Sequence, residues 1–375
     1  MTNRSEADDV GRHSLSSAHG ASRMALVTML APSARGFEAL ILSLGALVVA
    51  LVLFGIFAAM TGADPIAVYR TLWLGAFGTR FSIENTLTLA APLMLTALCT
   101  LIPARLGLLV IGGEGALVVG GLGAVLAGAL LTGLPWPVGT LACFISGAAA
   151  GALWIGFAGA LKHWRGVNET ISTLLLNYIA IAVLMHLVSG PIRDFAVTLK
   201  AQSWSISQSY MISNIPGWSV HWGLVIGIGV CIVMFLILRY TVLGFSIDVA
   251  GGNVRAAEMA GLPVGRLVLL ASCLGGAAAG LAGAIEVVAV HGAVSESLVV
   301  GFGYTGILVA FVARQNPLAV IVVALVLGGI SASGGLLQRR FDMPDAATVV
   351  LQGLIFLCVL AGNALSGRIV RTGGN

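Results

Sequence analysis

Charge is scarce in this chain. Asp, Glu, Lys and Arg make up 9% of its 375 residues, whereas 58% are hydrophobic, and the mean hydropathy is +1.02. This composition excludes a soluble globular domain, because too much hydrocarbon would face water. In a bilayer the backbone must satisfy its own hydrogen bonds, which leaves helices or a closed barrel. The apolar runs are continuous and do not alternate with a period of two, so we expect an all-α, polytopic membrane helix bundle.

The apolar runs also set the expected number of helices, because a span needs about 20 predominantly apolar residues. The eighth run is short, so it is tilted, broken or only half a span, and one helix more or fewer would also fit. The ten predicted spans are 40–60, 84–103, 115–133, 137–160, 171–190, 221–239, 267–290, 301–313, 317–336 and 346–365. They form a transmembrane domain at 37–366, between a polar tail at 1–36 and a short tail at 367–375.

Basic residues predict the orientation. With ten spans both termini lie on one side, and that side carries thirteen of the 19 Lys and Arg residues. Cytoplasmic loops are enriched in Lys and Arg, so we expect both tails to be cytoplasmic. A cleaved signal peptide is not expected, because the polar lead is long and 40–60 is long enough to span. Nothing indicates nucleic-acid binding.

The sequence lacks the residue patterns that nucleotide binding, catalysis and metal binding require. A phosphate-binding loop needs Gly-Lys followed by Ser or Thr, but Lys162 and Lys200 each follow a leucine. No Ser-His-Asp arrangement, acid-base carboxylate pair or metal cluster is evident, so we predict no enzyme activity, metal or cofactor in this chain. Any ATP would be bound by a partner. The cysteines lie inside apolar runs without metal-ligand spacing and are expected to be small buried side chains: Cys99, Cys143, Cys231, Cys273 and Cys358.

The 50 glycines cluster inside predicted helices, notably at 112–133 and 275–283. Small residues let helix backbones approach closely, and they also allow broken helices around a pathway. Two long segments, 61–83 and 191–220, lie on the predicted outer side. The first has an amphipathic pattern. The second is either a contact for an extracytoplasmic partner or a loop with aromatic anchors.

The predicted cytoplasmic loop 240–266 contains a capped helix. Asn253 is a good N-cap, 254–260 can form two turns, and Gly261 ends them. Such a short helix along the membrane surface is typical of a docking site for a cytoplasmic partner. The candidate docking residues are Gly251, Gly252, Asn253, Arg255, Ala256, Ala257, Glu258 and Gly261.

Ionisable and polar residues in the spans are candidates for a solute pathway, since charge at bilayer depth costs a few kcal/mol. Glu114 lies between glycines, where it lines a helix break or caps a helix. Glu286, five residues before His291, is a structural carboxylate, a pathway residue or a proton relay. Further candidates precede or enter the span 171–190, where capping alone would explain the first two: Asn168, Glu169, Asn177 and Tyr178.

Three stretches resemble one family. Residues 166–180, 251–261 and 301–318 (the last GFGYTGILVAFVARQNPL, with Tyr304) are similar to permease subunits of bacterial nucleoside ABC importers. The wider branched-chain and ribose-type group includes simple-sugar permeases. The long segments 61–83 and 191–220 resemble those of the larger nucleoside permease subunit. The chain departs from the family in one place: Val110 and Ala116 stand where the family commonly has two amide side chains. This departure affects which solute is expected, and it leaves the expected class of transporter unchanged.

The resemblance implies the membrane domain of a type II ABC importer in the bacterial inner membrane. A second permease, identical or different, would complete the pathway, an extracytoplasmic solute-binding protein would deliver the solute, and an ATPase would dock on 251–261. The solute would be a nucleoside or purine-like molecule, with Tyr304 a further pathway candidate. The alternatives are a simple-sugar permease or an ion-coupled secondary transporter, for which Glu286 is the fair candidate.

Overall fold

The structure is a computed structural model that describes residues 32–133, 135–197 and 200–372. The chain divides into two compact units, which we describe separately. The smaller contains residues up to Phe54 and from Leu357 onward, and the larger spans Gly55–Phe356. Helices α2 (Pro32–Met60) and α14 (Ala346–Thr372) each belong partly to both units. The predicted tail at 1–36 falls almost entirely outside the described residues.

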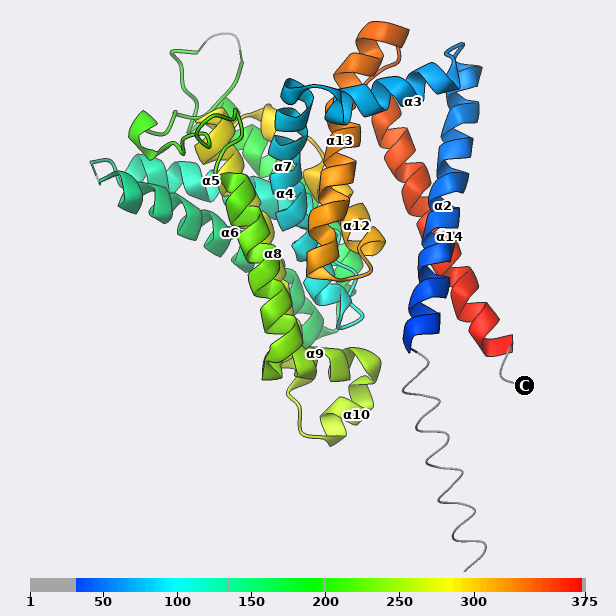
Figure 1. Cartoon of the computed structure of the whole chain (residues 1–375). Coiled ribbons are helices and arrows are strands. Elements are labelled where there is room, and N and C mark those ends of the chain that lie inside the picture. The colour runs from blue at the N-terminus through cyan, green and yellow to red at the C-terminus, as the bar shows by residue number, and fades with distance from the viewer. Residues whose placement is uncertain (1–31, 134, 198–199, 373–375) are drawn as a thin grey trace, which may run out of the picture. The chain divides into compact units, whose positions relative to one another are not determined.

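The larger unit consists of helices of very different lengths (Figure 1). The described ranges hold no strand, only three isolated β-bridges, so the all-α prediction is confirmed. The α-helices are α3 (Pro65–Trp73), α4 (Arg80–Ala104), α5 (Gly113–Leu130), α6 (Trp136–Arg165), α7 (Glu169–Ser189), α8 (Gly223–Tyr240), α9 (Val242–Gly252), α10 (Val254–Met259), α11 (Val264–Ile285), α12 (Phe302–Val312) and α13 (Pro317–Phe341). Shorter elements are π-helices η1 (Leu74–Gly78) and η3 (Glu286–His291) and 3-10 turns η2 (Gln208–Tyr210) and η4 (Glu296–Leu298).

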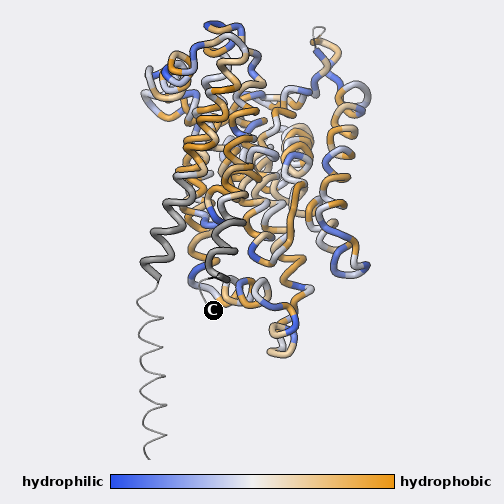
Figure 2. The backbone as a smooth tube through the Cα atoms, turned by 90° about the vertical axis from the view of Figure 1, so that its right-hand side faces the viewer, coloured by the Kyte–Doolittle hydropathy of each residue, from blue (hydrophilic) through white to orange (hydrophobic). Residues whose placement is uncertain are grey.

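Every predicted span coincides with a helix, and the segment 301–313 is indeed short. Within the described residues, seven helices are long and apolar enough to cross a membrane, or up to eight if α2 and α3, bent by 117° at their junction, form one span. The polytopic architecture is therefore confirmed, whereas the number ten stays a prediction. Hydrophobic residues run along the helices, and hydrophilic ones gather towards their ends (Figure 2).

The core of the larger unit is built around α4, which contacts α8, α11, α12 and α13. Helices α5, α6 and α11 pack against one another through glycines. A Cβ atom on Gly280 would overlap the backbone of Gly147 and Gly151 on α6, and one on Gly120 would overlap Gly280. The glycine clusters therefore serve close packing here, as membrane helices require.

Some local structure was not anticipated. The loop 240–266 holds two helices, α9 and α10, where only the second was expected. The amphipathic segment 61–83 becomes α3, capped by Asp64, followed by π-helix η1 and the first turn of α4. Among the cysteines, Cys99, Cys143 and Cys231 are buried as predicted, while Cys273 and Cys358 are only partly so.

Candidate functional site

The chain breaks its helical path between α4 and α5. Helix α4 ends at Ala104, and α5 begins at Gly113 with only 18 residues. From Leu108 to Gly112 the intervening segment is buried or partly buried, so the polar groups of its backbone need partners. Side chains of α4 and α7 supply them. Thr100 Oγ1 donates to the Val110 carbonyl (3.0 Å), Thr170 Oγ1 to the Leu109 carbonyl (3.0 Å) and Asn177 Nδ2 to the Ile111 carbonyl (3.4 Å), while Thr173 Oγ1 accepts from the Ile111 N–H (3.1 Å).

Glu114 stands in the first turn of α5 and is fully buried. Its carboxylate oxygens accept hydrogen bonds from the N–H groups of Gly301 (2.8 Å) and Gly303 (2.5 Å). These groups belong to the start of α12, where N–H groups have no partner within the helix and the helix dipole favours negative charge. Of the two roles expected for Glu114, the structure shows capping, but of a helix 187 residues further along the chain.

Asn177 links this break to the protein surface. Its Oδ1 accepts a hydrogen bond from the Gly115 N–H, and its Nδ2 donates to the hydroxyl of Tyr304 at 3.0 Å. Asn177 is fully buried, whereas Tyr304 is 41% exposed. The break, the start of α12 and one face of α7 therefore meet in a single polar network that ends at an accessible aromatic ring.

Three of the predicted pathway residues, Glu114, Asn177 and Tyr304, thus come together. Tyr178 follows Asn177 on α7 but is 61% exposed and has no described hydrogen bond to this network. The other candidates lie elsewhere. Asn168 Oδ1 caps α7 by accepting from the N–H groups of the next turn (2.9 and 3.2 Å), Glu169 pairs with Lys162 (2.9 Å), and Glu286 is buried in η3 with its carboxylate 3.7 Å from His291 Nε2.

The two positions that depart from the family pattern, Val110 and Ala116, lie in the protein interior. Val110 and Ala116 are buried in an apolar cluster with Cys99, Ile155 and Ala279. Neither side chain is exposed, so here the break is held by the threonines and Asn177. The threonines are not among the site residues predicted from the sequence, although Thr170, Thr173 and Asn177 recur at the spacing that places residues on one helix face.

The predicted docking segment is capped as expected. Asn253 Oδ1 accepts from the Ala256 N–H (3.1 Å), and Gly261 has a φ of +80° that favours glycine. Arg255 and Glu258 are exposed, whereas Ala257 is buried. The neighbouring helix α9 is tied to the start of the break. Arg105 pairs with Asp248 (3.3 Å), and a Cβ on Gly251 would overlap the Arg105 carbonyl.

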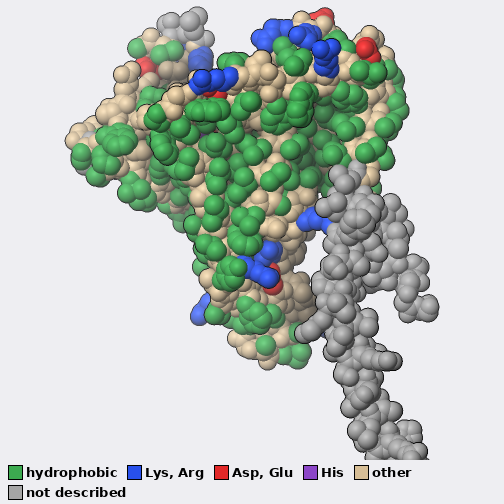
Figure 3. All heavy atoms as spheres, viewed as in Figure 1, with side chains coloured by type: hydrophobic (Ala, Val, Ile, Leu, Met, Phe, Trp, Pro, Cys, Tyr) green, Lys and Arg blue, Asp and Glu red, His purple; other side chains and the backbone are tan. Residues whose placement is uncertain are grey.

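The opposite end of the unit carries the long loop 190–222. Its backbone bonds to the segment that leads into α12: the N–H groups of Ser203, Ile206 and Ile212 donate to the carbonyls of Val294, Gly292 and Val288 (2.8–3.1 Å). Hydrophobic side chains cover the middle of the unit, and Lys and Arg side chains gather towards its ends (Figure 3). That distribution fits a protein with a band of hydrocarbon around it.

Comparison with known proteins agrees with this geometry. Residues 82–360 match the family model described as "Branched-chain amino acid transport system / permease component". The chain is 28% identical to the guanosine ABC transporter permease protein NupP of Bacillus subtilis, over 84% of this chain and 92% of the relative. It is 27% identical to the glucose ABC transporter permease protein TsgB13 of Haloferax volcanii (83% and 84%) and 27% to the nucleoside ABC transporter permease protein NupB of Lactococcus lactis (79% and 84%).

A match over this length settles the class of the protein. Permeases of this family do not catalyse a reaction, and they work in association with an ATPase and a solute-binding protein. The apolar helices agree with a protein that crosses the membrane several times. The chain therefore belongs to the permease family of ABC transport systems, as a multi-pass membrane component.

Proposed function

We propose that this chain forms the translocation pathway for a nucleoside or purine-like solute in an ABC importer of the bacterial inner membrane. The observation that carries the proposal is the network of Glu114, Asn177 and Tyr304 at the helix break. Tyr304 offers an exposed ring on which a base can stack, beside a polar group fixed by Asn177. Interrupted helices in the middle of a bundle are typical of solute sites. Three of the relatives are named for guanosine or nucleosides.

A simple sugar is the second candidate, because other relatives are named as permeases for glucose and galactofuranose. Uptake competition separates the two. Cells that carry the intact transport system should take up labelled guanosine, and cells with this gene deleted should not. Excess unlabelled inosine should compete, whereas excess ribose or glucose should not. Uptake of a labelled sugar that nucleosides leave unchanged would favour the second candidate.

Tyr304 is the residue to change at the site. Stacking of a base on an aromatic ring contributes about 1–3 kcal/mol, so Tyr304→Ala should weaken the apparent affinity of uptake for the nucleoside by roughly 5- to 150-fold. Tyr304→Phe keeps the ring and should retain most of the uptake. Equal loss in both variants would assign the effect to the hydroxyl and its bond to Asn177, and would argue against stacking.

The energy source is proposed to be a separate ATPase that docks on residues 251–261, with a second permease subunit, identical or different, completing the pathway. Arg255→Glu and Gly261→Trp should abolish ATP-driven uptake. Arg165→Glu, which alters an exposed arginine at the end of α6, is the matched control and should have little effect. If an uncoupler stops uptake while ATP is held constant, the transporter is ion-coupled instead, and Glu286 becomes the residue to test.

A further inference from the structure

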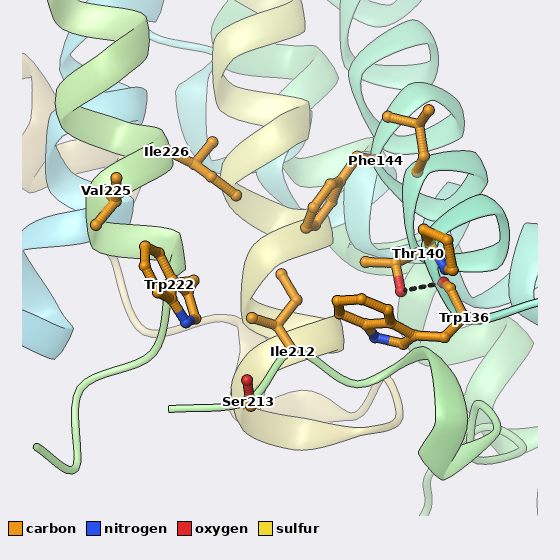
Figure 4. A pocket seen from close by; sticks show the side chains of 10 residues that line it. Trp136, Thr140, Phe144, Ile212, Ser213, Trp222, Val225 and Ile226 are labelled. Atoms are coloured by element: carbon orange, nitrogen blue, oxygen red, sulfur yellow. Dashed lines mark hydrogen bonds between the residues drawn. The ribbon is translucent and has the colours of Figure 1, made fainter. Parts of the chain in front are cut away.

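A pocket of about 390 Å³ lies apart from the helix break, between the first turns of α6 and α8 (Figure 4). Aromatic and aliphatic side chains from three elements line it. Trp136 and Phe144 come from α6, Trp222 and Ile226 from the start of α8, and Ile212 from the loop 190–222. No charged residue is among its lining residues.

One polar side chain of the pocket wall, Thr140, is already satisfied by the protein. The single hydroxyl hydrogen of Thr140 can be donated to the carbonyl of Trp136 (3.0 Å) or to the carbonyl of Tyr210 (2.9 Å). Ser213 supplies the remaining side-chain hydroxyl, beside Ile212. A polar solute would find only the Ser213 hydroxyl and the indole N–H groups of Trp136 and Trp222 to bond, and desolvating a strongly polar molecule here would be unfavourable. The pocket suits an apolar ligand with a small polar group near Ser213.

The position of the pocket indicates where that ligand comes from. Trp136 is the first residue of α6 and Trp222 immediately precedes α8, and tryptophan is enriched where membrane helices meet the headgroups. The rim residues Leu141 and Val225 are exposed, and the exposed apolar surface continues along the same two helices through Ile145 and Ile232. In a multi-pass protein that surface meets hydrocarbon, so the pocket is continuous with the interface to lipid.

We propose that this pocket binds one acyl chain of a phospholipid from the leaflet on the side of the loop 190–222, with the glycerol region of that lipid beside Ser213. The bound chain fills the space between α6 and α8 and packs against Ile212. The Ile212 N–H donates to the Val288 carbonyl at 3.1 Å, so the lipid also supports the loop where it contacts η3. This inference rests on the membrane location of the chain and is independent of the solute.

Native mass spectrometry of the full-length protein, released from nanodiscs of phosphatidylglycerol and phosphatidylethanolamine, tests the proposal. The wild type should keep one phospholipid per chain that survives mild delipidation. Ile226→Trp, which fills the pocket, should lose it. Val322→Trp, which adds the same side chain at an exposed position of α13, away from the pocket, should keep it. A wild type without retained lipid, or equal retention in both variants, would overturn the proposal.

A second measurement remains informative if Ile226→Trp fails to fold. A photoreactive benzophenone side chain at position 212, in an otherwise unaltered protein in those nanodiscs and in native membranes, reports what lies in the pocket. An adduct with the mass of a phospholipid supports the proposal. An adduct with another protein chain, or the absence of any lipid adduct, refutes the proposal.

Discussion

A single carboxylate holds two distant parts of this fold together. Glu114 accepts from two N–H groups at the start of α12 and has no exposed surface. Without an acceptor these two buried N–H groups would be left unsatisfied, which costs about 1–3 kcal/mol. We therefore expect Glu114→Ala to lower the melting temperature of the purified protein and to reduce uptake strongly. Glu114→Gln keeps one acceptor oxygen and should be less affected in both measurements.

The matched control for Glu114 is Glu296→Gln. It changes an exposed carboxylate in η4, on the segment that leads into α12. It should leave the melting temperature within experimental error. If Glu114→Ala melts like the wild type, then water or a neighbouring group satisfies α12 and the capping role assigned to Glu114 is wrong.

His221 is the residue whose titration should affect stability. It is 3% exposed, and neither ring nitrogen has a hydrogen-bond partner among the described residues. Burial lowers the pKa of His221 below its usual range. As the pH falls below about 6.5, the unfolded chain therefore binds a proton that the folded protein does not bind. Stability should be complete above that pH and should fall as the pH drops from it towards the lower folded-state pKa.

The measurement is the melting temperature of the wild type and of His221→Leu between neutral and mildly acidic pH. Other groups titrate in both proteins, so the difference between the two isolates His221. The wild type should lose stability relative to the variant as the pH falls. A difference that does not change with pH would mean that His221 is already solvated or partnered in the folded protein.

At the scale of helices, glycine contacts determine whether α5, α6 and α11 can assemble. A side chain at position 280 would meet the backbone of α6, which cannot move aside as a flexible side chain can. Overpacking of this kind costs about 1–3 kcal/mol and sometimes more. Gly280→Val should therefore lower the melting temperature and the yield of folded protein. Gly229→Val on α8, where a Cβ meets nothing within 4 Å, should be tolerated.

Local features of these elements could be predicted from the sequence, and long-range ones could not. The caps at Asn168 and Asn253 involve residues two or three positions away, so the local pattern is sufficient to predict them. The partners of Glu114 come from residues 301 and 303, and no spacing in the sequence joins them to residue 114. The π-helix at Glu286–His291 follows directly on α11, and the continuous apolar pattern does not show where the α-helix ends and the π-helix begins.

At the scale of the molecule, one continuous set of contacts runs from the proposed docking segment to the helix break. Helix α10 follows α9, α9 is tied to Arg105, and Arg105 begins the non-helical segment that Asn177 and the threonines hold. At the opposite end of the larger unit, backbone hydrogen bonds join the loop 190–222 to the segment that leads into α12. Movement at either end would therefore reach the network of Glu114, Asn177 and Tyr304 through backbone segments, which suits a protein that couples a partner's motion to a pathway.

This coupling requires that the docking segment and the loop 190–222 lie on opposite sides of the membrane, and that prediction can be tested by labelling. In a chain whose native cysteines are replaced by alanine, Ser209→Cys, an exposed site in η2, should react with a membrane-impermeant maleimide in intact cells. Glu258→Cys, exposed on α10, should react only after permeabilisation. Between the two sites, α8 is the one described helix long enough to cross the membrane, so the two sites should lie on opposite sides of it. A cysteine at Ser16 should behave like the one at 258, because six predicted spans, an even number, lie between them. Labelling of Ser16→Cys in intact cells, with Glu258→Cys protected, would show an odd number of crossings and would overturn the predicted cytoplasmic N-terminus.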